Sequence, residues 1–150
     1  ILDDLGLVAA IEWQMEEFKR KSKVSCKIEI NCQQDSFERN ISTAFFRIFQ
    51  ESLTNIARHA QATQVLTQLY EMDQQLVLKI KDNGIGISRE NQNKIFEMFY
   101  RVSDNNTGTG LGLYLVKEIV DKLAGKIEVE SEVGKGTAFI VRFPNKPEVN

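Results

Sequence analysis

The segment ESLTNIARHA carries four side chains suited to phosphate or metal chemistry, namely Glu51, Asn55, Arg58 and His59. Apolar residues around them recur at helical spacing, which predicts a helix over residues 38–60. At about 100° per residue, the four polar side chains share one stripe of that helix. Such a stripe could bind phosphate, although a solvated helix face with an incidental Glu–Arg pair would look the same. The opposite side, which we expect to face the core, carries Phe45, Phe46, Phe49, Leu53, Ile56 and Ala57.

Three later segments are rich in glycine. DNGIGI, residues 82–87, follows a strand-like alternation and has more glycine than a hairpin turn of two residues needs. GTGLGL, residues 108–113, opens a predicted helix, where backbone N–H groups can bind an anion. A flexible loop is the simpler alternative there. GKGT, residues 134–137, is on its own typical of a plain hairpin turn.

Other nucleotide-binding patterns do not fit these glycines. The dinucleotide fingerprint would need a glycine at Leu113, and the P-loop would need one at Val129. The signature of eukaryotic-type protein kinases is also absent, because His59 is followed by Ala60-Gln61 rather than by Arg-Asp.

The composition is that of an ordinary globular domain, with 150 residues, 42% of them apolar, and a net charge of −2. Basic residues are dispersed, which argues against a nucleic-acid partner. No apolar run approaches the roughly 20 residues of a membrane helix. Cys26 and Cys32 lack zinc-site spacing, so we expect two reduced thiols. The chain lacks an initiator Met, so we expect it to be part of a longer protein.

The elements that must position these segments follow from the periodicity. We expect helices over 7–20, 38–60 and 111–125, short helices within 88–101 beginning at a capping Ser88, and strands over 23–31, 63–72, 74–82, 126–132 and 137–143. Strands that adjoin in sequence favour antiparallel hairpins rather than a βαβ repeat. The predicted fold class is an α/β (α+β) two-layer sandwich, with a mixed, mostly antiparallel sheet and helices on one face.

Taken in order, five motifs resemble those of the catalytic, ATP-binding domain of bacterial sensor histidine kinases. This domain belongs to the GHKL superfamily, with DNA gyrase, the heat-shock ninety chaperones and the mismatch-repair ATPases. ESLTNIARHA resembles the N box, DNGIGI the G1 box, FEMFYR the F box, GTGLGL the G2 box and GKGTAF the last glycine box. The resemblance covers about residues 23–143 and implies the Bergerat-type ATP-binding fold.

The segment LDDLGLVAAIEWQ is similar to the one that joins the phosphoacceptor helices to this domain in nitrate-sensor-like kinases. The F box and the double-glycine G2 box are those of the commoner kinase type. We therefore expect residues 1–22 to be a linker or helix from the missing phosphoacceptor domain. Residues 23–145 would be the catalytic domain and residues 146–150 a tail.

The resemblance implies Mg-ATP as the ligand. Asn55 would offer an oxygen to Mg²⁺, Arg58 and His59 would hydrogen-bond phosphates, and Glu51 would accept a proton from the nucleophile or polarise it. Glu51 and Asn55 are thus the expected catalytic pair.

The glycine boxes would bind the base and the triphosphate. Asp82 would accept a hydrogen bond from the adenine amino group, and Thr137 would reach the base through a water shared with Asp82. Asn83 would assist at phosphate or Mg²⁺. Further expected ligand or lid contacts are Gly84 and Gly86, which keep side chains off the base and sugar, Ile85 and Ile87 as apolar contacts, Phe96 and Phe99 as lid anchors, Arg101 at the γ-phosphate, and Thr107, Gly108, Thr109, Gly110, Leu111, Gly112 and Leu113 around the triphosphate.

The implied reaction is transfer of the ATP γ-phosphoryl group to a histidine of a separate dimerisation and phosphoacceptor domain, in two-component signalling. His59 is the only histidine here and belongs to the N box, so the chain should bind ATP without autophosphorylating. The implied partners are that helical domain and a response regulator. The implied location is cytoplasmic, with membrane contact only through a missing part. The alternatives are a GHKL-type ATPase, an anti-sigma-type serine kinase and a non-catalytic nucleotide sensor.

Overall fold

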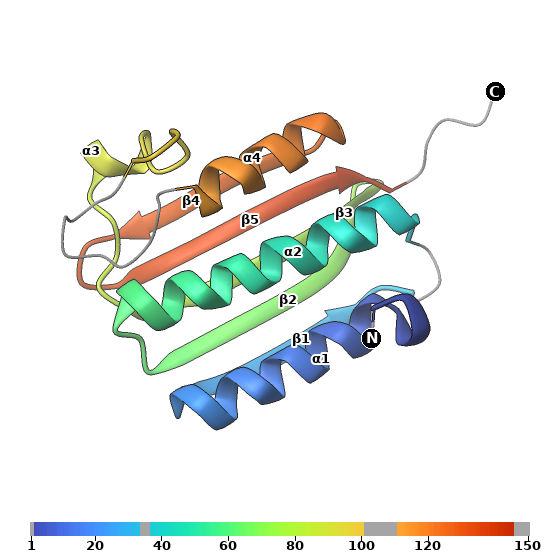
Figure 1. Cartoon of the computed structure of the whole chain (residues 1–150), viewed down its shortest axis with the longest axis horizontal. Helices are drawn as coiled ribbons and strands as arrows, with labels where there is room; N and C mark the ends of the chain where they lie inside the picture. Colours follow the sequence, from blue (N-terminus) through green and yellow to red (C-terminus); the bar gives the residue numbers. More distant parts are fainter. Residues whose placement is uncertain (1, 34–36, 101–110, 146–150) are drawn as a thin grey trace.

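A computed structural model describes residues 2–33, 37–100 and 111–145. Their strands form one sheet in the order β1-β2-β3-β5-β4, and α1, α2 and α4 lie side by side across one face of it (Figure 1). The strands are β1 (Ser25–Asn31), β2 (Gln64–Met72), β3 (Gln75–Asp82), β4 (Lys126–Glu132) and β5 (Gly136–Pro144). The helices are α1 (Leu2–Ser22), α2 (Arg39–Asn55), the π-helical turn η1 (Ile56–Ala60), α3 (Arg89–Gln92) and α4 (Gly112–Lys122). The predicted fold class is confirmed.

One strand pairing in the sheet is parallel. β1 and β2 are parallel, with α2 and η1 as the crossover between them, whereas β2–β3, β3–β5 and β4–β5 are antiparallel. The first half of the chain therefore contains one βαβ unit. The two predicted hairpins, β2–β3 and β4–β5, are confirmed. The expected mixed sheet takes its parallel pair from this unit, because a helix separates β1 from β2 and lets the chain return in the same direction.

The core lies between the sheet and the helices. Phe45 of α2 and Phe143 of β5 are fully buried, and their rings meet edge to face with centroids 5.0 Å apart. α1 contributes Leu7, Ile11 and Met15 to the same core. Residues 2–22 thus pack as part of the domain, whereas the predicted origin of this helix in a phosphoacceptor domain remains a prediction.

α2 does not continue to residue 60 as a regular helix. The chain widens into η1 at Ile56–Ala60 and ends at Gln61, which has a left-handed φ of 53°. A π-helical turn advances fewer degrees per residue than an α-helix, so the predicted stripe no longer applies beyond Asn55. Ala57, expected on the buried side, is exposed for this reason.

The region predicted to hold short helices after Ser88 contains only α3, a single helical turn. Ser88 is the N-cap residue of α3, as predicted, but its side chain makes no capping hydrogen bond. Beyond α3 the chain continues in turns, and Phe99 takes a positive φ of 65°, which a helix cannot accommodate.

The aromatic contact in the core gives a test of the packing. Phe45→Ala would leave a cavity against Phe143 and should lower the free energy of unfolding by about 3–5 kcal/mol. Arg47→Ala, on the exposed side of the same helix, should change it by no more than about 0.5 kcal/mol. Urea unfolding followed by circular dichroism measures both, and equal losses would contradict the assigned core face.

Candidate functional site

The site is built around a buried carboxylate. Asp82 is the last residue of β3 and is 5% exposed. Its Oδ1 accepts a hydrogen bond from the Gly84 backbone N–H at 2.8 Å. Burial raises the pKa of the Asp82 carboxyl above its usual range, while the backbone N–H groups of Gly84 and Thr137 act in the opposite direction. A carboxylate has about four lone-pair positions, so it retains capacity for a ligand donor.

A polar row crosses three neighbouring strands at this end of the sheet. Asp82 of β3 pairs with Thr137 of β5, which pairs in turn with Ser131 of β4. Paired positions point to the same face of a sheet, so these three side chains lie together. The Ser131 and Thr137 hydroxyl oxygens are 2.8 Å apart. Thr137 therefore stands beside Asp82, as its predicted role requires.

The glycines of DNGIGI have a structural cause that differs from the predicted one. A Cβ on Gly84 would lie 2.2 Å from the carbonyl oxygen of Ala60, and one on Gly86 would lie 2.2 Å from that of Glu132. Gly86 also has a φ of +77°. The loop is packed against η1 on one side and β4 on the other. Close approach of protein backbone requires glycine at both positions, and their contact with the base stays a prediction.

Backbone hydrogen bonds hold the same loop in place. The Ile85 N–H donates to Ala60 O at 2.8 Å, and the Gly134 N–H donates to Ile85 O at 2.8 Å. The Ile87 N–H donates to Ser131 Oγ at 2.7 Å. The loop therefore leaves Asp82 along a fixed path toward α3.

Asn83 is engaged with the start of β2. Its Oδ1 accepts hydrogen bonds from the backbone N–H groups of Thr63 and Gln64, both at 2.9 Å, and its Nδ2 donates to Thr63 Oγ1 at 2.9 Å. These contacts give the side chain a bracing role. They lend no support to its predicted role at phosphate or Mg²⁺.

The end of α2 brings the other polar residues toward the loop. Asn55 is half-buried, and its Nδ2 is buried without a hydrogen-bond partner among the described residues. His59 is half-buried, whereas Arg58 is exposed. The four residues of the predicted stripe thus differ in exposure, because η1 rotates Arg58 and His59 away from helical spacing.

Glu51 lies against the first residue of α4. A Cβ on Gly112 would stand 1.8 Å from Oε1 of Glu51, so the carboxylate occupies the space that a side chain would fill. A negative group is favoured at the N-terminus of a helix, where the backbone N–H groups have no helical partner. The N box and the G2 box therefore meet at this point.

The lid region is described only in part. Phe96 packs edge to face on Phe139, with ring centroids 6.4 Å apart, whereas Phe99 is 63% exposed. Leu111 and Leu113 are half-buried at the start of α4. The predictions for Arg101, Thr107, Gly108, Thr109 and Gly110 lie outside the described residues.

Sequence reasoning missed two residues that hold the loop after β3 beside this site. Ser131 accepts from Ile87 N–H and contacts Thr137, while Gln92 Nε2 donates to Ile87 O at 2.8 Å and to Ser131 O at 3.0 Å. Neither residue belongs to a glycine motif. The available signal was the position of Ser131 opposite Thr137 in the 126–132 and 137–143 strand pair, which places a hydroxyl beside a predicted ligand residue.

The residues present suit a magnesium ion held mainly through a nucleotide. Among the described residues, no group of three or more His, Cys, Asp and Glu side chains could hold a metal ion. Mg²⁺ commonly binds one or two protein ligands together with phosphate oxygens and water. Asn55 fits one such ligand. Its Nδ2 has no hydrogen-bond partner among the described residues, so no hydrogen bond fixes which end of the amide is the oxygen, and a turn of the amide group would put Oδ1 in that place.

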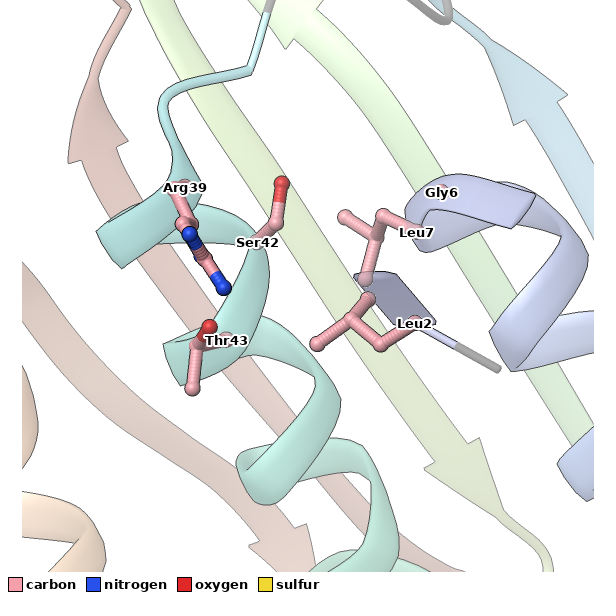
Figure 2. Close-up of a pocket in the computed structure, with 6 residues that line it drawn as sticks. All are labelled: Leu2, Gly6, Leu7, Arg39, Ser42 and Thr43. Atoms are coloured by element: carbon pink, nitrogen blue, oxygen red, sulfur yellow. The ribbon is translucent and has the colours of Figure 1, made fainter. Parts of the chain in front are cut away.

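A cavity of about 290 Å³ lies elsewhere, between the first turns of α1 and α2 (Figure 2). Leu2 and Leu7 of α1 face Arg39, Ser42 and Thr43 of α2 across it. It is at the opposite end of α2 from Asn55 and contains none of the predicted nucleotide residues.

The two cysteines are poor candidates for nucleophilic chemistry. Cys26 and Cys32 are free thiols, and burial raises the pKa of each, which makes them weak nucleophiles at neutral pH.

Across the described part of the chain, the helices are too short or too polar to cross a membrane.

The comparisons with known proteins agree with this geometry. The profile of the family described as "Histidine kinase-, DNA gyrase B-, and HSP90-like ATPase" matches residues 40–147. The chain belongs to this family. It corresponds to the catalytic, ATP-binding domain of histidine kinases.

Individual relatives are named as sensors. The chain is 27% identical over 143 residues to the oxygen sensor histidine kinase NreB of Staphylococcus carnosus, covering 95% of this chain and 38% of the relative. It is 45% identical over 82 residues to the sensor protein SrrB of Staphylococcus aureus, covering 52% of this chain and 14% of the relative. The solved structure of the mycobacterial sensor histidine kinase MprB superposes with a TM-score of 0.73 at 26% identity, covering 94% of this chain and 95% of that one.

Gly86 and Gly134 both have a positive φ, so alanine substitutions at the two positions give a paired test of the packing. Gly134→Ala meets no atom within 4 Å but forces alanine to a φ of +86°, so it should cost about 1–2 kcal/mol of unfolding free energy. Gly86→Ala adds a clash with Glu132 O and should cost about 1–3 kcal/mol more. Urea unfolding without nucleotide measures the difference, and equal costs would show that the loop is not packed on β4.

The Asp82 carboxyl predicts a pH-dependent stability. Its pKa is raised on folding, so the folded state binds the proton more tightly than the unfolded state does. The wild-type chain therefore loses stability as the pH rises from the ordinary pKa of the unfolded state through the raised pKa of the folded state. Asp82→Asn has no such proton. Its free energy of unfolding relative to the wild type should therefore be greater at about pH 8 than at about pH 4. Any constant cost of the new amide cancels in this comparison, and a pH-independent difference would refute the assigned burial.

Proposed function

We propose that this chain transfers the γ-phosphoryl group of Mg-ATP to a histidine of a separate phosphoacceptor domain. In this step the bond between the γ-phosphorus and its bridging oxygen breaks, ADP leaves, and an imidazole nitrogen forms the new bond to phosphorus. The observation that carries the proposal is the buried carboxylate of Asp82 beside the Thr137 hydroxyl, at the end of two central strands. Such a pair suits a ligand that presents an amino group.

Adenine has that group, and guanine has a carbonyl at the same position. A carbonyl facing Asp82 would oppose two acceptors in a buried place, which costs the desolvation of both. The raised pKa of Asp82 reflects how little solvent reaches the carboxyl. The Asp82 side chain would therefore select adenine by requiring a donor. Thr137 would act through a water shared with that carboxylate.

The other end of the ligand would lie between η1 and α4. Asn55 would contribute an oxygen to Mg²⁺, and Arg58 and His59 would bind phosphate oxygens. Backbone N–H groups at the start of α4 suit the same phosphates. Glu51 is close enough to Gly112 to stand beside them, where it would accept a proton from the attacking imidazole or orient it.

The acceptor must come from another domain. The one histidine of the chain, His59, lies in η1, where the proposal has it bind phosphate rather than accept it. The chain spans 38% of the length of NreB and 14% of that of SrrB, and both names describe sensors. A helical phosphoacceptor domain and a response regulator are therefore the proposed partners, in the cytoplasm.

The first test concerns the base. Asp82→Asn should weaken Mg-ATP binding at least about tenfold in calorimetry, because an amide can present a donor where the adenine amino group needs an acceptor. Asp73→Asn is the matched control, since Asp73 is an exposed carboxylate in the turn at the other end of β3. Equal affinity in the wild type and Asp82→Asn would remove the adenine assignment.

The second test concerns the reaction. The chain is mixed with a separately prepared phosphoacceptor hairpin and ATP labelled at the γ-phosphate, and label on the hairpin that is acid-labile and alkali-stable supports the proposal. Release of phosphate alone would favour an ATPase of the same family, and acid-stable label would favour a serine kinase. Glu51→Gln should slow transfer by about two orders of magnitude or more while leaving ATP affinity within about threefold.

A further inference from the structure

Ser131 occupies an unusual position beside the proposed base-binding residues. Its hydroxyl is within 2.8 Å of three groups, namely the Ile87 N–H, the Gly136 carbonyl and the Thr137 hydroxyl. These groups belong to the loop after β3 and to β5, whereas Ser131 itself is on β4. One hydroxyl thus joins the chain that leads toward the lid to the strand that carries Thr137.

The hydrogen count makes the Ser131–Thr137 contact directional. A serine hydroxyl has one hydrogen and can accept from two donors. Ser131 already accepts from the Ile87 N–H, so its hydrogen lies toward either Gly136 O or Thr137 Oγ1. In the first case Thr137 donates to Ser131, and in the second it accepts from it. In both cases Ser131 determines which way the Thr137 hydroxyl can turn.

Gln92 provides a natural comparison within the same structure. Its Nε2 donates to Ile87 O and Ser131 O, so it ties the same loop to the same strand. It makes no hydrogen bond to Thr137 among the described residues. Gln92 therefore holds the loop without touching the hydroxyl beside Asp82.

We infer that Ser131 is a positioning residue for base recognition, which orients the Thr137 hydroxyl beside Asp82 and couples it to the loop at Ile87. This rests on the proposed function, because it assumes that Asp82 and Thr137 bind the adenine base. Thr137 is 7% exposed and has no other side-chain hydrogen bond within the described part of the chain. Without Ser131 the Thr137 hydroxyl is free to rotate. The difference in affinity between a base with an amino group and a base with a carbonyl group then becomes smaller.

The experiment compares ATP with inosine triphosphate, which has a carbonyl in place of the adenine amino group and the same phosphates. Calorimetry with Mg²⁺ gives the ratio of the two Kd values for the 150-residue chain and its variants. Ser131→Ala should reduce the preference for ATP by about threefold to tenfold, the range of one hydrogen bond. Ser131→Thr keeps the hydroxyl and should restore the wild-type ratio.

Gln92→Met separates positioning from loosening of the loop. It removes both hydrogen bonds of Gln92 but leaves the Thr137 hydroxyl in place, so the ratio should stay within about twofold of the wild-type value. Amide exchange of Ile87, measured without nucleotide, should rise in Ser131→Ala and confirm that the bridge is broken. If Ser131→Ala does not remain folded, Ser131→Cys replaces it with a weaker donor of similar size.

Two results with the variants would overturn the inference. One is an unchanged preference for ATP in Ser131→Ala, and the other is an equal loss of preference in Gln92→Met. A wild-type chain that binds both nucleotides equally would also overturn it, while leaving ATP binding intact. A wild-type chain that binds neither nucleotide would overturn the proposed function and this role together.

Discussion

A carboxylate kept out of water at the end of a central strand is the constraint on which the rest of the site depends. Removing an ionised group from water costs several kcal/mol unless hydrogen bonds replace the lost hydration. Two backbone N–H groups, from Gly84 and Thr137, do this only in part, and the pKa of Asp82 is raised in consequence. A ligand that donates a hydrogen bond to the remaining lone pairs would offset this desolvation cost. The contact with Asp82 would therefore contribute strongly to the binding free energy.

The surroundings of Asp82 are rigid because backbone meets backbone there. The loop after β3 touches η1 at Ala60 and β4 at Glu132, both through glycine. Gly136 approaches the carbonyl of Asp82 in the same manner, since a Cβ there would lie 2.0 Å from that oxygen. Three segments far apart in the sequence are thereby held at one point. Selection of the base would then belong to this fixed part of the fold.

Much of the architecture followed from the sequence, because periodicity reports burial directly. The strand at 126–132 was predicted with its observed bounds, and the other strands differ by one or two residues at an end. The antiparallel direction of the two hairpins followed from their short connections. The direction of β1 against β2 did not follow, since periodicity is the same in parallel and antiparallel strands. The widening of the helix at Ile56–Ala60 was also missed, because a π-helical turn is stabilised by contacts such as Ala60 with Ile85.

In the candidate site too, local motifs could be found in the sequence, whereas contacts between distant segments could not. Asp82 and Thr137 were identified from motifs, and their pairing across β3 and β5 places them together. The glycines were predicted as contacts of the base, and that role stays a prediction. Their close approach to Ala60 and Glu132 could not be predicted, because a sequence cannot show which backbone segments approach each other. Ser131 and Gln92 escaped notice because they hold the loop after β3 through contacts across 44 and 39 positions of the sequence.

The most direct test of the central claim is a crystal structure of the chain bound to ADP and Mg²⁺. The account predicts a distance of about 2.7–3.2 Å between an Asp82 carboxylate oxygen and the exocyclic amino nitrogen of adenine. A base bound elsewhere, or one that turns its amino group away from Asp82, would contradict the account.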